Sequence, residues 1–244
     1  MPSVLAYHRP QSLEDAWALL SNPEHALLAG GTLIVPAVRR NPDAGATFID
    51  LQALGLDTLG VDGDRLNLGA MARLGDLMVD ARVPALLADL CRRELPSALR
   101  NAATIGGTVG AAGSVTAADS VLLAGLLVHD AAVGLHGAAD RSLADYLDSR
   151  PVGIVTVVSM ETEGAGTLAV TGRTPADVPI VAAVGRRTPS GIRLALTGVA
   201  ATPVLVDPTD PTAGLEPPSD FRGSSDYRLH LASTLAARVV QELS

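Results

Sequence analysis

Apolar residues recur at helical spacing near both ends of the chain. In "LEDAWALL", residues 13–20, they fall on one helical face, Ser12 is placed to cap that helix, and Pro23 ends it. "YRLHLASTLAARVVQEL", residues 227–243, has the same period. The pattern predicts a helix at each of these two places.

The middle of the chain carries further helical signals. Residues 74–99 are helical in pattern, and Pro84 and Pro96 divide them into two pieces. "RSLADYLD", residues 141–148, predicts a short amphipathic helix. "DSVLLAGLLVHD", residues 119–130, is apolar on every side, so its periodicity fits a helix or a buried strand equally well.

Short runs rich in β-branched and apolar residues, bounded by turn residues, predict strands. The predicted strands are "HALL" at 25–28, "ATFIDL" at 46–51, "RLNLGAMARL" at 65–74 after the turn "VDGD", and "GIVTVVSMET" at 153–162. Residues 178–200 predict a β-hairpin around the loop "RTPSG", and residues 203–218 a proline-rich surface connector. Strands and helices mixed in this way, with a separate C-terminal unit after "EGAGT" at 163–167, predict an α+β (mixed α/β) fold.

Composition narrows the function classes. The 244 residues carry a formal net charge of −8, which argues against a nucleic-acid partner. There is no apolar run long enough for a membrane span and no signal-peptide pattern at the start, so we expect a cytoplasmic protein. Cys91 is the single cysteine, which excludes an intramolecular disulfide and an all-cysteine metal cluster within this chain.

Two glycine-rich stretches are the strongest candidates for function. "LLAGGT", residues 27–32, ends a predicted strand, and "TIGGTVGAAG", residues 104–113, precedes the apolar segment. Bare backbone amides at such places attract anionic oxygens, although a tight turn would also explain each stretch by itself. Neither stretch matches the dinucleotide-binding or P-loop spacing. Their shared design predicts that both approach one pyrophosphate, while Thr116 and Asp119 are placed to cap the helix that follows.

No other group of residues indicates chemistry of its own. The five histidines are scattered without metal-ligand spacing, and no pair of carboxylates suggests acid–base work. The charges of "FRGSSDYR", residues 221–228, are expected to cap and surround the last helix. We therefore predict a protein that holds a cofactor, with no catalytic side chain and no metal site.

"LLAGGT" at 27–32, "RNAATIGGTVGAA" at 100–112 and Asp119 together resemble the FAD-binding medium subunit of molybdenum hydroxylases of the carbon monoxide dehydrogenase and xanthine dehydrogenase type. The resemblance covers the whole chain. It implies a two-lobed FAD-binding domain of the molybdopterin dehydrogenase type over residues 1–165, with lobes of about 1–56 and 57–165. It also implies a small C-terminal flavoprotein domain with a β-sheet and helices over residues 166–244.

The resemblance implies that both loops and the later aspartate contact FAD. Carried over to this chain, the cofactor-binding residues are Ala29, Gly30, Gly31, Thr32, Leu33, Thr104, Ile105, Gly106, Gly107, Thr108 and Asp119. Two of these differ from the family pattern, because Leu33 replaces a polar residue and Thr108 replaces an asparagine.

The leading hypothesis is a FAD-binding electron-transfer subunit. By resemblance, it would receive electrons from a 2Fe-2S subunit, itself fed by a molybdenum cofactor subunit, and pass them to an external acceptor within a hetero-oligomer. The alternative is a stand-alone relative that has weakened or lost FAD binding and holds a different small molecule between its lobes. The substitutions at Leu33 and Thr108 are the reason to keep this alternative.

Overall fold

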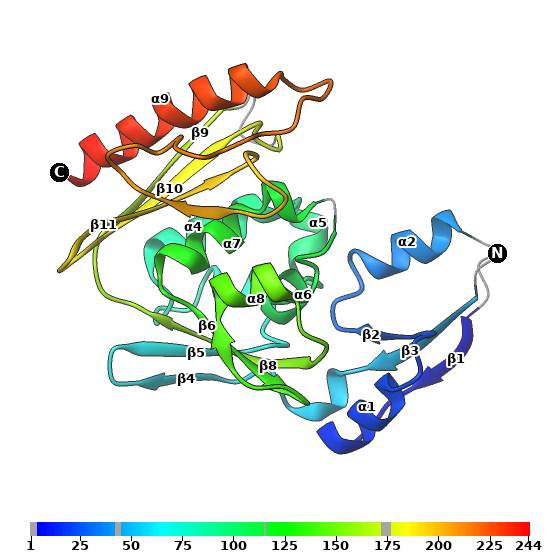
Figure 1. Ribbon diagram of the computed structural model, residues 1–244. Helices are drawn as coiled ribbons and strands as arrows, with labels where there is room; N and C mark the ends of the chain where they lie inside the picture. The colour runs from blue at the N-terminus through cyan, green and yellow to red at the C-terminus, as the bar shows by residue number, and fades with distance from the viewer. Residues whose placement is uncertain (1–3, 42–44, 115, 172–176) are drawn as a thin grey trace.

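The computed structural model describes residues 4–41, 45–114, 116–171 and 177–244, which form three β-sheets with helices around and between them (Figure 1). The fold is mixed α/β, as the pattern of strands and helices predicts. The proposed division into domains at residues 56 and 165 stays a prediction.

The first sheet is parallel and lies at the N-terminal side of the molecule. Its strand order is β1 (Val4–His8), β3 (Ala46–Asp50), β2 (His25–Leu28). Helices α1 (Leu13–Leu20) and α2 (Ile34–Arg40) lie on its two faces (Figure 1). The Asp15 amide donates to Ser12 Oγ at 3.1 Å, which confirms the predicted cap of α1. We call residues 4–41 and 45–54 the N-terminal lobe.

The second sheet is antiparallel and has five strands. Its order is β4 (Leu59–Asp62), β5 (Arg65–Gly69), β8 (Ile154–Glu161), β6 (Ala132–His136), β7 (Arg141–Ser142). The sequence pattern misses β4, because it predicts only a turn at "VDGD" between the strands at 46–51 and 65–74. Residues 59–62 instead pair with β5 through a tight turn at Gly63, whose φ is +59°. The predicted strands at 46–51 and 65–74 follow one another in the sequence prediction, but in the structure their counterparts β3 and β5 belong to different sheets.

Residues 74–100 form three helices where the pattern predicts two. They are α3 (Leu74–Leu77), α4 (Ala85–Glu94) and α5 (Ser97–Arg100). Pro84 and Pro96 occupy the N-cap positions of α4 and α5, where the missing proline N–H costs no helical hydrogen bond. The prolines therefore start helices as well as end them.

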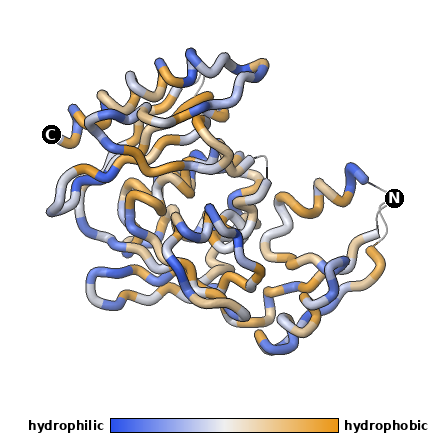
Figure 2. Tube along the Cα trace, viewed as in Figure 1, coloured by the Kyte–Doolittle hydropathy of each residue, from blue (hydrophilic) through white to orange (hydrophobic). Residues whose placement is uncertain are grey.

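The third sheet carries the C-terminal part of the chain. Its antiparallel order is β12 (Val204–Val206), β11 (Gly191–Thr197), β10 (Ala182–Thr188), β9 (Gly166–Val170). The strands β10 and β11 are the predicted hairpin. Helix α9 (Ser225–Leu243) packs on one face of this sheet, and its hydrophilic and hydrophobic residues alternate along its length (Figures 1 and 2).

The apolar segment at 119–130, whose periodicity fits a helix or a buried strand, contains the helix α7 (Val121–Val128). The next helix along the chain is α8 (Leu143–Ser149). All eight residues of α7 are buried, because the helix packs against α4 and against the inner face of the third sheet (Figure 1). A helix surrounded in this way needs apolar residues on every side. The crossing with α4 is close at Gly125, where an added Cβ would lie 2.1 Å from Leu90 Cδ1.

The cap of α7 differs from the sequence prediction. Ser120 Oγ accepts from the Leu123 amide at 3.1 Å, and the carboxylate of Glu94 accepts from the Leu122 amide at 2.9 Å and from Ser120 Oγ at 2.6 Å. Thr116 and Asp119 do not cap this helix. Their segment makes a separate 3-10 turn, η2 (Ala117–Asp119), and the capping carboxylate comes from α4 instead.

His129 follows α7 and makes stability depend on pH. Its Nδ1 lies 2.8 Å from the Glu161 carbonyl oxygen and must donate to it, and the ring is buried. Burial lowers the pKa of His129 to about 4, and the nearby Arg186 acts in the same direction. The unfolded chain therefore binds a proton that the folded protein excludes as the pH falls from about 6.5 towards 4, and stability is lost over that range.

We expect the His129→Asn variant to lose less stability on acidification than the wild type. From pH 7 to pH 5 the histidine alone costs the wild type about 2 kcal/mol, since it must stay neutral in the folded protein. Urea unfolding at both pH values measures the difference. His230→Asn, which changes an exposed histidine of α9, should retain the wild-type pH dependence. Equal pH dependence of stability in the wild type and in His129→Asn would contradict the claim that His129 causes this loss of stability.

Within the described ranges, no helix has the length and apolar character to cross a membrane.

Candidate functional site

The two glycine-rich stretches meet in the structure. The first leaves β2 at Leu28 and turns through residues 29–33 into α2, while the second begins a short helix, α6 (Ile105–Gly110). A Cβ added to Gly30 would lie 1.9 Å from the carbonyl oxygen of Ala102, two residues before the Thr104 that caps α6. The lack of a side chain at Gly30 is therefore what allows the two segments to touch.

The first loop presents unused backbone donors. Gly31 has φ +70°, and the carbonyls of Gly31 and Leu33 accept from the first turn of α2 at 3.1 and 3.2 Å. The amides of Gly30, Gly31, Thr32 and Leu33 donate no hydrogen bond to any described residue. Consecutive free amides around a left-handed residue form a concave site for anionic oxygens.

The amides of the second stretch donate to other groups of the protein. The Ile105 and Gly106 amides donate to the carbonyls of Ala72 and Ala70 at 2.9 and 2.8 Å, and Thr104 Oγ1 accepts from Gly107 at 3.0 Å. The Thr108 amide donates to the Thr104 carbonyl, so α6 is a true helix and not an open phosphate-binding loop. Its backbone is held against β5 and the turn that follows it.

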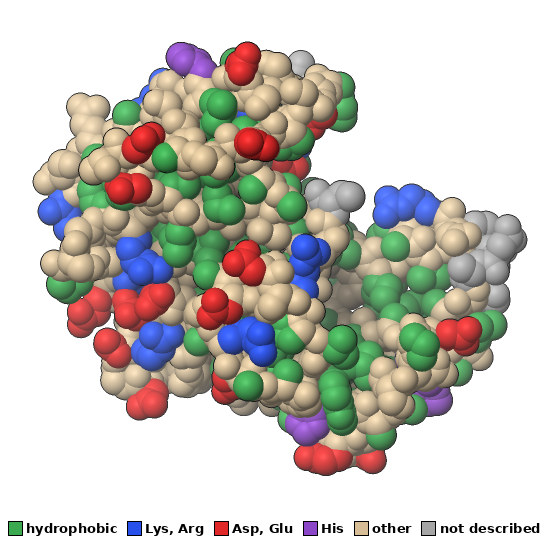
Figure 3. Space-filling model, viewed as in Figure 1, with side chains coloured by type: hydrophobic (Ala, Val, Ile, Leu, Met, Phe, Trp, Pro, Cys, Tyr) green, Lys and Arg blue, Asp and Glu red, His purple; other side chains and the backbone are tan. Residues whose placement is uncertain are grey.

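What α6 contributes is a surface without side chains. Gly107 and Gly110 lie three residues apart and so share one helix face. A Cβ added to Gly107 would lie 2.9 Å from Thr104 Oγ1 and 3.8 Å from the Ala29 Cβ, and one added to Gly110 would meet no atom within 4 Å. The bare face of α6 thus borders the first loop, and Figure 3 shows the surface hollowed between the N-terminal lobe and the rest of the molecule.

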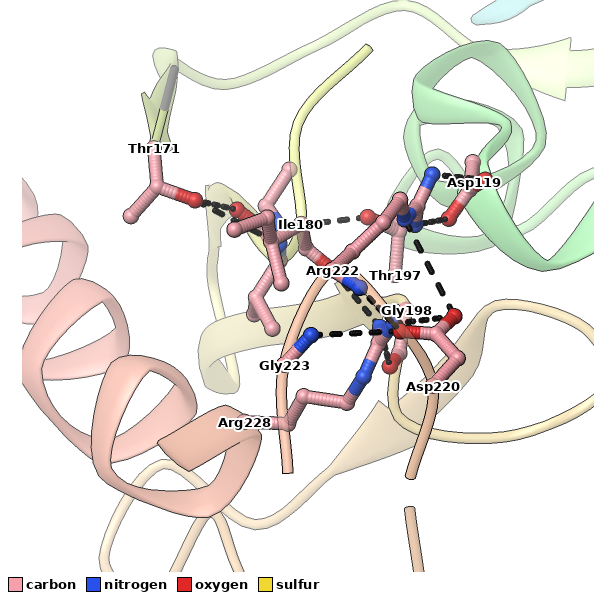
Figure 4. Close-up of polar contacts among 11 residues, drawn as sticks. Asp119, Thr171, Ile180, Thr197, Gly198, Asp220, Arg222, Gly223 and Arg228 are labelled. Atoms are coloured by element: carbon pink, nitrogen blue, oxygen red, sulfur yellow. Dashed lines mark hydrogen bonds and ion pairs between the residues drawn. The ribbon is translucent and has the colours of Figure 1, made fainter. Parts of the chain in front are cut away.

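Asp119 lies on η2 and faces the C-terminal part of the chain. Arg222 Nη1 and Nη2 donate to its two carboxylate oxygens at 2.8 and 2.7 Å (Figure 4). This pairing raises the pKa of Arg222. The sequence pattern predicts only that Arg222 helps to cap and surround the last helix, and nothing in the local sequence pairs it with a residue 103 positions earlier.

Arg228 in the same stretch is buried, contrary to the expectation that the charges of "FRGSSDYR" lie at the surface of the last helix. It is 1% exposed and donates to both oxygens of Asp220 at 2.8 Å, to the Ile180 carbonyl at 3.1 Å and to the Gly198 carbonyl at 2.8 Å (Figure 4). The cap of α9 comes from an uncharged residue of the stretch, because Ser224 Oγ accepts from the Tyr227 amide at 3.2 Å.

The structure therefore joins most of the predicted site residues in one place. The ten residues brought together by the two loops are Ala29, Gly30, Gly31, Thr32, Leu33, Thr104, Ile105, Gly106, Gly107 and Thr108. Asp119 follows α6 in the chain but contacts the C-terminal part through Arg222. The roles of all eleven residues toward a cofactor stay predictions.

Comparisons with known proteins show the family of this chain. Residues 3–156 match the family of the FAD binding domain in molybdopterin dehydrogenase. The chain is 30% identical over 249 residues to the uncharacterized protein YgfM of Escherichia coli K12, covering 95% of this chain and 93% of that protein. It is 25% identical to the putative xanthine dehydrogenase FAD-binding subunit XdhB of the same organism, covering 97% and 95%.

The fold is also that of solved structures. A chain of carbon monoxide dehydrogenase from Hydrogenophaga pseudoflava superposes with a TM-score of 0.88 at 22% identity, covering all of this chain and 98% of the other. A chain of quinoline 2-oxidoreductase from Pseudomonas putida 86 gives 0.86 at 20% identity, with the same coverage. The family match over residues 3–156 defines a domain of the FAD-binding type. The chain belongs to the FAD-binding subunit family of molybdenum hydroxylases.

Proposed function

We propose that this protein is a FAD-binding electron-transfer subunit that passes electrons from an iron–sulfur partner to an external acceptor. The observation that carries the proposal is the set of four unused amides at Gly30–Leu33, which lies beside the bare glycine face of α6. A pyrophosphate needs several donors on one side and close backbone approach on the other. The residues present fit such a group.

Within this proposal the two loops have different roles. The amides of the first loop and the Thr32 hydroxyl would donate to phosphate oxygens, whereas the hydrogen bonds of the Ile105 and Gly106 amides hold α6 in place beside that loop. Leu33 is 38% exposed and contributes its amide in place of a polar side chain. Asp119 retains two lone-pair directions beyond those taken by Arg222, since a carboxylate offers about four.

Bound FAD would accept and release electrons, and the protein would bind it and exclude water from it. Cys91 is the only cysteine and is buried, so this chain cannot ligate an iron–sulfur cluster through cysteines alone. The proposal therefore includes a 2Fe-2S subunit and a molybdenum cofactor subunit as partners in a hetero-oligomer. The family membership supports this assembly.

We expect the purified protein to bind FAD. The absorption spectrum should show the two visible bands of oxidised flavin, either as purified or after adding FAD and removing the excess. At a FAD concentration 100 times Kd the folded protein gains about 2.7 kcal/mol, which for a chain of this size raises Tm by roughly 5–10 °C. FMN, which has a single phosphate, should raise Tm less.

A protein without flavin bands, whose Tm is indifferent to FAD, would contradict this function. The alternative, a relative that holds a different small molecule between its lobes, would then take its place. One observation favours that alternative: the amides at the start of α6 already donate to other groups of the protein. Only the first loop is then left to donate backbone hydrogen bonds to a ligand.

A further inference from the structure

The turn before α7 is held by the C-terminal part of the chain at two points. The Gly198 amide donates to the carbonyl oxygen of Ala118 at 2.7 Å, which holds the backbone. Arg222 binds the carboxylate of the next residue, Asp119, through both terminal nitrogens. Residues from the loop after β11 and from the segment before α9 therefore clamp adjacent positions of η2.

These two contacts belong to one closed ring. The carbonyl of Gly198 accepts from Arg228 Nη1, and Arg228 Nη2 binds both oxygens of Asp220. The Asp220 carboxylate lies 4.0 Å from Arg222 Nε, and Arg222 returns to Asp119 (Figure 4). The charged side chains of the ring alternate in sign along the order Arg228, Asp220, Arg222, Asp119, and backbone groups of Gly198 and Ala118 close it.

The short turn that carries Arg222 is itself closed by hydrogen bonds. The Asp220 amide donates to the Gly223 carbonyl at 3.1 Å, and the Gly223 amide donates back to the Asp220 carbonyl at 3.2 Å. Asp220 Oδ1 also accepts from the Arg222 amide at 2.9 Å. Arg222 therefore reaches Asp119 from a backbone that is already ordered, and little entropy is lost when the pair forms.

We propose that Arg222 is a positioning residue for FAD, which acts by orienting the Asp119 carboxylate toward the cofactor. This inference rests on the proposed function, since it gives Asp119 its predicted contact. The bidentate pair leaves two lone-pair directions of the Asp119 carboxylate for a donor on the cofactor. FAD affinity is then set jointly by the glycine loops and by a residue of the C-terminal part that lies outside the family match at 3–156.

A lysine at this position would keep the charge and lose the geometry. Its ammonium is a point charge that cannot make two parallel hydrogen bonds to a carboxylate. Arg222→Lys is therefore the informative change. We expect it to weaken FAD binding about tenfold, because one of the two charge-assisted hydrogen bonds that orient the Asp119 carboxylate is lost.

The test is a double-mutant cycle on the full-length protein, with FAD affinity measured by quenching of flavin fluorescence. Wild type, Arg222→Lys, Asp119→Asn and the double variant are titrated with FAD. In the Asp119→Asn background, Arg222→Lys should change affinity by less than about twofold, because its effect passes through Asp119. If the lysine variant folds poorly, Arg222→Gln takes its place in the cycle. As a second readout, the visible absorption maximum of bound flavin should shift in the single variants.

The matched control is Arg82→Lys. Arg82 also makes a bidentate pair, to Asp80, in the turn before α4, and its loss should leave FAD affinity unchanged. Wild type that fails to bind FAD overturns the proposed function and this inference with it. Wild type that binds FAD, together with an Arg222→Lys effect that is absent or equally large without the Asp119 carboxylate, overturns this inference alone.

Discussion

Replacing Gly30 with alanine is expected to weaken FAD binding by at least a hundredfold and to destabilise the flavin-free protein by about 2 kcal/mol. The new Cβ would fall 1.9 Å from the Ala102 carbonyl oxygen and 3.0 Å from the Ala103 Cα. Both are backbone atoms, so no side-chain rotation relieves the overlap. The loop after β2 must move away from α6, which separates the unused amides from the glycine face beside them.

Two measurements check this expectation: a FAD titration of the full-length variant, and urea unfolding without FAD. Gly60→Ala is the matched control, because an added Cβ at Gly60 in the exposed strand β4 meets no atom within 4 Å. Its stability should stay within about 0.5 kcal/mol of wild type, and its FAD affinity should not change. A Gly30→Ala variant that binds FAD like wild type would show that contact between the loops is not needed.

Replacing Arg228 with methionine is expected to lower the stability of the protein by about 3 kcal/mol. Methionine fills much of the same space but cannot donate. The carbonyls of Ile180 and Gly198 would lose their donor inside the protein, and Asp220 would lose both hydrogen bonds from the guanidinium. Because Asp220 also lies beside Arg222, the ring that holds Asp119 would loosen at the same time.

Thermal unfolding should show a loss of roughly 10 °C in Tm for Arg228→Met, given the size of the chain. Arg238→Met provides the control on the same helix, since Arg238 is exposed and its replacement should cost less than about 0.5 kcal/mol. Similar Tm values for the two variants would mean that the buried guanidinium of Arg228 contributes no more to the stability of the folded protein than the exposed guanidinium of Arg238.

The sequence by itself determined the elements that depend on local chemistry. Ser12 and the spacing of apolar residues were enough to place α1, and alternation with a polar loop was enough to place the β10–β11 hairpin. The glycine stretches were found for the same reason, since glycine marks places where the backbone must be bare. The resemblance carried by those stretches then identified the family.

Other features depend on residues far apart in the chain, and only the tertiary structure decided them. Periodicity could not decide whether residues 119–130 form a helix, because a segment buried on all sides shows no polar face. The turn signal "VDGD" overlaps strand β4, whose residues become a strand only by pairing with β5.

The cap of α7 by Glu94 and the pairing of Arg222 with Asp119 join residues 28 and 103 positions apart. The same holds at the candidate site, where the sequence identified both glycine stretches but could not show how each uses its amides. Hydrogen bonds from Ile105 and Gly106 to Ala72 and Ala70 exist only once α6 has packed beside β5, and they leave the first loop with the unused donors. Local pattern fixes which backbone can be bare, whereas long-range packing decides which of its polar groups remain free to bind a ligand.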